Sequence, residues 1–96
     1  MYYTAEQREI DCKKLDELDA AIREDRGRRY GTKDNTLANA AAFGWRGSII
    51  NLYECAMRLR NAFYATELNV DDIKNACQDA RNYARYVEIL LEKGIT

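Results

Sequence analysis

The residues best suited to chemistry lie on two successive segments. A polar ridge lies late in the sequence, and a carboxylate and a guanidinium group lie on the segment before it. The ridge repeats at intervals of four, three and four residues, which places its members on one side of a helix. Its members are Asn75, Asp79, Asn82 and Tyr86. If the preceding segment folds back antiparallel, Glu54 and Arg58 face this ridge, and the six side chains predict a ligand-binding groove. The alternative is an ordinary solvated helix face, with Glu54 and Arg58 as a surface ion pair.

A second candidate site is basic. Residues 23–33 contain four arginines and one lysine, opposed by two acids, Glu24 and Asp25. Guanidinium and ammonium groups bind phosphate and carboxylate, so this cluster indicates an anion-binding site formed by Arg28, Arg29 and Lys33. The alternative is a solvated basic loop that binds nothing.

Residue types exclude several kinds of catalysis and metal binding. The sequence has no histidine, so neither a serine-type nor a papain-type catalytic group can be assembled. Gly44 and Gly47 do not form a phosphate-binding loop, because no strand precedes them and no Gly-Lys-Ser/Thr follows. Cys12, Cys55 and Cys77 lack C-x-x-C spacing, which argues against zinc and for reduced thiols. We therefore predict no catalytic residue, no metal site and no resident cofactor.

Composition and charge place the chain among ordinary folded proteins. With 47% hydrophobic and 32% charged residues and no proline, the sequence predicts a folded chain rather than a disordered one. Its net charge of −1 does not support bulk attachment to nucleic acid or membrane. No apolar run approaches the roughly 18–20 residues that span a bilayer, and the first residues do not resemble a signal peptide. These features predict a cytoplasmic protein.

The first helix is predicted from a capping box. Thr4 followed three residues later by Gln7 is typical of a helix start, and Gly27 is expected to end the helix after about Arg26. Its narrow apolar stripe consists of Leu15, Leu18 and Ile22. Asp11 falls on the same stripe, either as a polar group beside the core or as the exposed end of the stripe.

The middle of the chain is predicted to contain a loop, a short helix and a long helix. Residues 27–35 read as the longest loop, residues 37–43 as an alanine-rich short helix, and Gly44 as its stop. Ser48 is a good N-cap for a helix over residues 49–65, whose broad apolar face predicts the most buried helix of the protein.

The last helix is the clearest element of the sequence. Asn69 is a suitable N-cap, apolar residues then recur at intervals of three and four, and Gly94 ends the pattern. Ala80 and Ala84 would let a neighbouring helix approach closely, which favours antiparallel packing against residues 49–65. The prediction is an all-α fold, a small helical bundle of three long helices and one short helix, as a single domain over residues 1–96.

Three stretches resemble the nucleotide-modification-associated domain family of bacteria and phages, which is similar to the all-α nucleotide pyrophosphohydrolases. They are Phe-Gly-Trp-Arg-Gly at 43–47, Asn-Leu-Tyr-Glu-Cys-Ala-Met-Arg-Leu at 51–59, and the segment 70–84 that ends in Asp-Ala-Arg-Asn-Tyr-Ala. The resemblance covers roughly residues 30–93. It implies an acidic site residue at Glu54, with Arg58 and Leu59 in the matching positions, and Asp79, Asn82 and Tyr83 on the last helix.

Departures from the family pattern argue against pyrophosphohydrolase activity. Cys55 stands where the pattern expects lysine, and Asn75 stands where it expects the first acid of the last helix. Magnesium-dependent phosphoanhydride hydrolysis needs several carboxylates, and only Glu54 and Asp79 remain. The sequence therefore favours a scaffold that has lost activity, with magnesium as a cofactor only if activity persists.

Aromatic residues point to binding by protein contact. Seven tyrosines in 96 residues exceed what so small a core can bury, and exposed tyrosine is typical of protein interfaces. Trp45 beside Arg46 is expected either to fill the core or to stack on a base. We predict a non-enzymatic helical binding protein, for example a phage-encoded modulator of a protein in the host cytoplasm, with a protein partner or a homo-oligomer. The alternative is a nucleotide-binding domain or a weak magnesium-dependent nucleotide pyrophosphohydrolase.

Overall fold

A computed structural model of the chain describes residues 1–30 and 38–96, and these are helical apart from their connections and ends. The elements are α1 (Ala5–Tyr30), α2 (Ala38–Ala41), α3 (Gly44–Tyr64) and α4 (Val70–Glu92). The predicted all-α fold is confirmed, and α2 is a single turn of four residues. None of the helices in the described part of the chain has the length and apolarity needed to cross a membrane.

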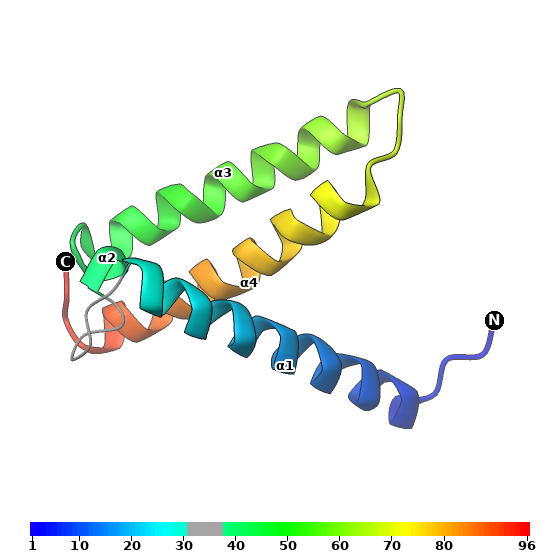
Figure 1. Cartoon of the computed structure of the whole chain (residues 1–96), viewed down its shortest axis with the longest axis horizontal. Coiled ribbons are helices and arrows are strands. Elements are labelled where there is room, and N and C mark those ends of the chain that lie inside the picture. The colour runs from blue at the N-terminus through cyan, green and yellow to red at the C-terminus, as the bar shows by residue number, and fades with distance from the viewer. Residues whose placement is uncertain (31–37) are drawn as a thin grey trace.

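Helices α3 and α4 form an antiparallel hairpin (Figure 1). The predicted N-cap of α4 is confirmed, because the Asn69 side chain accepts a hydrogen bond from the Asp72 backbone N–H at 3.1 Å. Small side chains lie deepest in the hairpin: Cys55 on α3 and Ala76 on α4 are 2% and 1% exposed. Their size allows the two helices to pack closely along their length.

The end of α4 is joined to the start of α3, in what we call the closed end of the hairpin. Gly94 has φ +69, and the Gly94 and Ile95 N–H groups donate to the Leu91 and Leu90 carbonyls, which is the Schellman pattern. The predicted stop at Gly94 is thus confirmed. The Ile95 carbonyl then accepts a hydrogen bond from the Trp45 N–H at 3.2 Å, so the turn after α4 satisfies a free N–H group at the start of α3. Leu90, 1% exposed, lies at this end.

The start of α3 differs from the prediction. Ser48 was expected to be the N-cap and Gly44 to stop the short helix, but α3 begins at Gly44, which has φ +66. Ser48 lies one turn inside the helix and is 1% exposed. Glycine is needed at position 44 for its φ and for space, because a Cβ there would lie 2.2 Å from the Thr96 carbonyl carbon.

Helix α1 crosses α4 with its second half and projects away from the hairpin with its first half (Figure 1). Its predicted start is confirmed by the hydrogen bond from the Gln7 N–H to Thr4 Oγ1, although the Gln7 side chain donates to Asp11 rather than back to Thr4. Its predicted end is wrong. The helix runs through Gly27 to Tyr30, because Arg28 and Arg29 complement the negative end of the helix dipole and pair with acids one turn earlier.

We call residues 5–18 of α1 the arm and residues 63–70, where α3 turns into α4, the tip. The predicted apolar stripe of α1 is covered only at its end: Leu15 and Leu18 are 43% and 42% exposed, because the arm extends beyond α4, whereas Ile22 is half-buried. The prediction that α3 is the most buried helix is also wrong, because a larger share of its residues is exposed than in α4, including Phe63 at 80% and Ile50 at 60%. Asp11 accepts hydrogen bonds from Gln7 on the arm and from Tyr3 just before it, so it belongs to the exposed end of the stripe.

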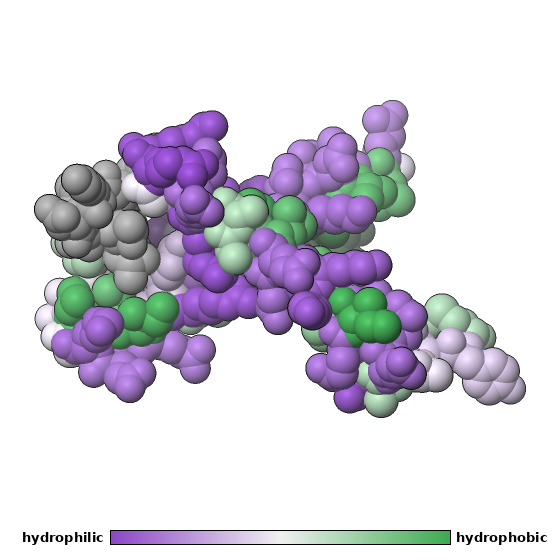
Figure 2. Space-filling model, turned by 60° about the horizontal axis from the view of Figure 1, so that its bottom comes forward, coloured by the Kyte–Doolittle hydropathy of each residue, from purple (hydrophilic) through white to green (hydrophobic). Residues whose placement is uncertain are grey.

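The molecule exposes more surface than its size requires. Its accessible area is 7575 Å², whereas a folded monomer of 11.1 kDa typically exposes about 5,700 Å². Its radius of gyration is 15.3 Å, compared with about 12.5 Å for a compact domain of this length. The projecting arm and hairpin and the extended first four residues contribute to both differences, and apolar side chains are visible on each projection (Figure 2).

Candidate functional site

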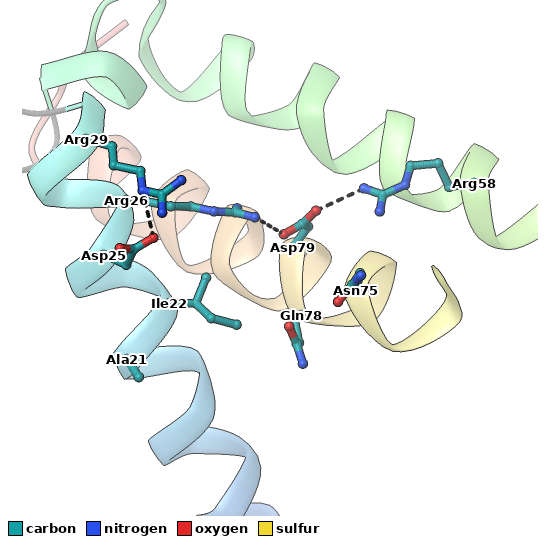
Figure 3. A pocket seen from close by; sticks show the side chains of 9 residues that line it. All are labelled: Ala21, Ile22, Asp25, Arg26, Arg29, Arg58, Asn75, Gln78 and Asp79. Atoms are coloured by element: carbon teal, nitrogen blue, oxygen red, sulfur yellow. Dashed lines mark hydrogen bonds and ion pairs between the residues drawn. The ribbon is translucent and has the colours of Figure 1, made fainter. Parts of the chain in front are cut away.

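A polar hollow of about 570 Å³ lies where the second half of α1, the middle of α3 and the first half of α4 meet. Three guanidinium groups and two carboxylates line it: Arg26, Arg29, Arg58, Asp25 and Asp79. Asn75 and Gln78 of α4 and an apolar patch of α1 complete the wall (Figure 3). The hollow opens to solvent and is built mainly of charged groups.

Asp79 is the centre of this hollow. Arg26 Nη2 donates to Asp79 Oδ1 at 2.6 Å, and Arg58 Nη1 donates to Asp79 Oδ2 at 2.9 Å (Figure 3). The Asp79 side chain is only 15% exposed, whereas Arg26 and Arg58 are 38% and 48% exposed. The carboxylate therefore joins α1 and α3 to α4. The hydrogen bond to Asp79 also raises the pKa of Arg58 above its ordinary value.

A second ionic cluster, which we call the Asp19 cluster, holds α1 against α4 deeper in the interface. Arg81 binds Asp19 through two hydrogen bonds of 2.7 Å, and Arg85 Nη1 adds a third at 3.0 Å. The Asp19 side chain is fully buried. Its pKa is held below the ordinary value, first by the hydrogen bond from Arg81 and then by that from Arg85, which together outweigh the cost of burial. Arg85 also pairs with Asp16 on the exposed side.

Asn82 joins the Asp19 cluster to Arg23 of α1. It is 2% exposed, and its Oδ1 accepts hydrogen bonds from Arg23 of α1 at 3.0 Å and from Arg85 at 3.3 Å. Its amide nitrogen is buried without a partner among the described atoms. Asn82 is therefore committed to the contact between α1 and α4, and its side chain does not line the hollow.

The predicted groove is brought together only in part. Arg58, Asn75 and Asp79 line the hollow, as the antiparallel arrangement predicted. Glu54 is exposed on α3 and does not line it. Tyr86 lies further along α4, half-buried against Tyr83 with ring centres 6.3 Å apart, and burial raises the pKa of both phenols.

The predicted anion site is largely neutralised by its own helix. Arg28 pairs with Glu24 and Asp25, and Arg29 pairs with Asp25 at 3.1 Å. Lys33 lies outside the described residues. The sequence prediction placed Arg28 and Arg29 in a loop, whereas both lie on α1, where helical spacing places acids one turn away from them.

The remaining reactive groups do not form a site. Cys12, Cys55 and Cys77 are free, and burial raises the pKa of the Cys55 thiol, which keeps it protonated at neutral pH. No group of three acids or thiols in residues 1–30 and 38–96 is arranged to hold a metal ion. The Arg46 guanidinium lies 4.1 Å from the centre of the half-buried Trp45 ring, so one ring face is already covered by its neighbour.

Chemically, the hollow is an internal salt-bridge site. A carboxylate between two guanidinium groups is a poor ligand for a cation, because the cation would have to approach two positive charges. The arginines are also engaged, so an anion would have to compete with Asp25 and Asp79 for them. The arrangement is suited to holding three helices together.

Sequence reasoning missed the buried partner in this interface. Asp19 lies four residues after Leu15 and three before Ile22, so it is on the predicted apolar stripe of α1 just as Asp11 is. A carboxylate at that position should be matched by a cation, and Arg81 and Arg85, spaced by four on α4, supply it. That complementary spacing was the available signal.

Comparison with known proteins gives no relative to reason from: no protein-family model, curated protein or solved structure matches the chain. The resemblance to nucleotide-modification-associated domains therefore stays a prediction.

Proposed function

We propose that this chain is a small helical protein-interaction module, which binds a protein partner through the apolar side chains of its arm and tip. The observation that supports this proposal most is the group of large apolar side chains that stay exposed at the tip and on the arm. At the tip, Phe63 is 80%, Tyr64 70% and Leu68 78% exposed, and on the arm Ile10 is 44% exposed. Exposed apolar side chains that gather on one part of a folded chain are typical of interaction sites.

The aromatic content of these surfaces supports the same function. Phe63 and Tyr64 stack edge to face with ring centres 5.0 Å apart, so the tip presents a preassembled aromatic pair. Tyr2 and Tyr3, which precede the arm, are 103% and 52% exposed. Aromatic side chains bury a large area with few rotatable bonds, which makes them effective anchors at protein interfaces.

The nucleotide alternative has one favourable observation and one unfavourable one. Arg26, Arg29 and Arg58 line a hollow that is large enough for a nucleotide. Magnesium-dependent hydrolysis, however, would need Glu54 and Asp79 to share a site, and Glu54 does not line the hollow while both Asp79 oxygens bind arginine. We therefore keep nucleotide binding as the second candidate and place no catalytic step in this site.

Affinity capture with matched variants tests the proposal. The full chain and a tip variant, Phe63→Gln/Leu68→Gln, are used as bait beside a control, Glu67→Gln, which changes an exposed polar tip residue. We expect a protein that is retained by the wild type and the control and is lost with the tip variant. Direct binding of that purified protein must show the same ranking. Equal retention by all three baits would contradict the proposal.

A thermal-shift assay tests the second candidate. Nucleoside triphosphates, with and without Mg²⁺, should raise the melting temperature if they bind the hollow, and Arg58→Gln should reduce that shift. No shift at millimolar nucleotide would remove nucleotide binding from consideration without affecting the protein-binding proposal.

A further inference from the structure

We propose that the partner of the arm and the tip is a second copy of this chain, in a two-fold dimer where the arm of each copy packs on the tip of the other. This inference rests on the proposed function and names its partner. It follows from the total area that the chain exposes, from the placement of the apolar side chains of the arm and the tip, and from the scarcity of hydrogen bonds between the arm and the hairpin.

The excess of exposed area over a typical monomer is large enough to contain a stable dimer interface. The chain exposes 7575 Å², roughly 1,900 Å² more than a monomer of its mass typically does. Covering this excess on both copies would bury about 3,800 Å² in total, within the roughly 2,000–5,000 Å² typical of obligate homodimers. Net charge does not oppose association, because each copy carries only −1.

The two surfaces are placed so that one two-fold operation covers both. The arm and the tip project from the same side of the molecule, away from the closed end (Figure 1). Each carries apolar side chains and they diverge, so the chain does not cover one with the other (Figure 2). In a two-fold dimer, if the arm of one copy contacts the tip of its partner, the partner's arm contacts the first copy's tip. Both apolar surfaces are then buried by a single kind of contact.

The arm has little tertiary support within the chain. The long-range side-chain hydrogen bonds that the structure records from α1 begin at Asp16, so the first three turns of α1 lack such bonds to the hairpin. In proteins most of the stability of a helix comes from packing of one face, and these turns extend the anchored half of α1 without such packing. Ile10 and Leu15 on these turns, 44% and 43% exposed, offer the apolar contact that would stabilise them in a dimer.

Molar mass in solution tests the inference. Sedimentation equilibrium or light scattering after size exclusion should give twice the chain mass of 11.1 kDa for the wild type. An arm variant, Ile10→Gln/Leu15→Gln, and a tip variant, Phe63→Gln/Leu68→Gln, should each raise the dimer dissociation constant about tenfold or more. The control Lys13→Gln/Glu67→Gln, at exposed polar positions of the same segments, should not. Circular dichroism checks that each variant keeps the hairpin.

Mixing the two variants tests the crosswise pairing. A mixed dimer contains one contact between an intact arm and an intact tip, whereas neither variant alone can form one. We therefore expect the mixture to form dimers more tightly than either variant does. A mixture that associates no better than its components would overturn the arm-to-tip pairing.

The same preparations separate this inference from the proposed function. A wild type that is monomeric at high micromolar concentration overturns the second copy as partner. If such a monomer still retains another protein through Phe63 and Leu68, protein binding stands and only the dimer fails. If it retains nothing, both proposals fail.

Discussion

Helix α4 is packed on two sides by two different kinds of contact. Toward α3 it presents small and apolar groups, with Ala76 and Leu90 each 1% exposed. Toward α1 it presents arginines and amides, and the most buried side chain of α1 is a carboxylate, Asp19. Burial of apolar surface is not directional and barely depends on pH or salt, whereas the second contact depends on charge and geometry.

The difference between these two contacts implies different stabilities for the two parts of the molecule. The hairpin is held together by backbone hydrogen bonds at its closed end and by close packing of its two helices. Helix α1 is attached mainly through ion pairs, several of which include half-exposed arginines. We expect α1 to open at a lower free energy than the hairpin does.

The largest effect is expected at the closed end of the hairpin. Leu90→Ala removes a buried side chain from a thin core and should lower the free energy of unfolding by about 2–4 kcal/mol. Urea unfolding measures this value. The neighbouring Leu91, 55% exposed, provides the control, because Leu91→Ala should cost well under half as much. Similar costs for the two variants would show that Leu90 does not anchor the hairpin.

The next effect is expected at the contact between α1 and α4. Asp19→Asn keeps the shape of the side chain and leaves Arg81 and Arg85 without their carboxylate, which should cost about 2 kcal/mol. Hydrogen exchange should show the loss in α1 amides and leave the α3 and α4 amides nearly unchanged. Asp16→Asn, at a 67% exposed position that pairs with the same Arg85, should have little effect. Equal exchange in α1 and the hairpin would mean that the two parts open together.

Acid should reproduce this effect in the wild type. The pKa of Asp19 is lowered from 3.8 in the folded protein, so the folded state binds fewer protons than the unfolded state. The stabilisation by Asp19 is therefore complete above the unfolded pKa and is lost as the pH falls through the lower folded pKa. Exchange of α1 amides, corrected for intrinsic rates, should increase below about pH 4. Asp19→Asn should remove this component of the pH dependence, and a variant with the same acid response as the wild type would contradict the assignment.

A smaller effect is expected where the turn after α4 meets α3. Gly44 and Gly94 both have positive φ, so alanine at either position costs about 1 kcal/mol in backbone strain. At Gly44 the new Cβ would also lie 2.2 Å from Thr96, whereas at Gly94 it would meet nothing within 4 Å. Gly44→Ala should therefore be the more destabilising variant in thermal unfolding. The reverse order would show that the contact with Thr96 is not maintained in solution.

The sequence predicted the hairpin well because its signals are local. Asn69 and Gly94 each act within a few residues of their own position, and the structure confirms their roles. The predicted small residues Ala80 and Ala84 are half-buried, and the small residue buried deepest on α4 is Ala76. The path of α1 was not predictable in the same way. Leu15 and Leu18 read as a buried stripe, yet whether they are covered depends on where α1 crosses α4, and Asp19 fixes that crossing through residues 62 and 66 positions away.

The sequence predicted several residues of the candidate site, but it did not predict the ion pairs that these residues form. Arg58, Asn75 and Asp79 do meet in one hollow. The sequence could not show that Arg26 of α1 would bind the Asp79 carboxylate. The periodicity of one helix does not reveal which charged residues of another helix lie against it. Gly27 was predicted to end the first helix, so the prediction stopped this helix at about Arg26. The next turn of α1, which carries Arg29 of the hollow, was therefore predicted as loop.

The smallest effect is expected where the two kinds of contact meet. Arg58 of α3 and Arg26 of α1 share Asp79, so Arg58→Gln should weaken the attachment of α3 to this carboxylate while leaving Arg26 in place. Arg58 is 48% exposed, so the cost should be below about 1 kcal/mol and should shrink further in high salt. The double variant Arg58→Gln/Asp79→Asn then measures the coupling in a double-mutant cycle by urea unfolding. No coupling would show that Asp79 serves α1 alone, whereas a coupling that salt reduces would mean that this carboxylate links the apolar hairpin to the ionic attachment of α1.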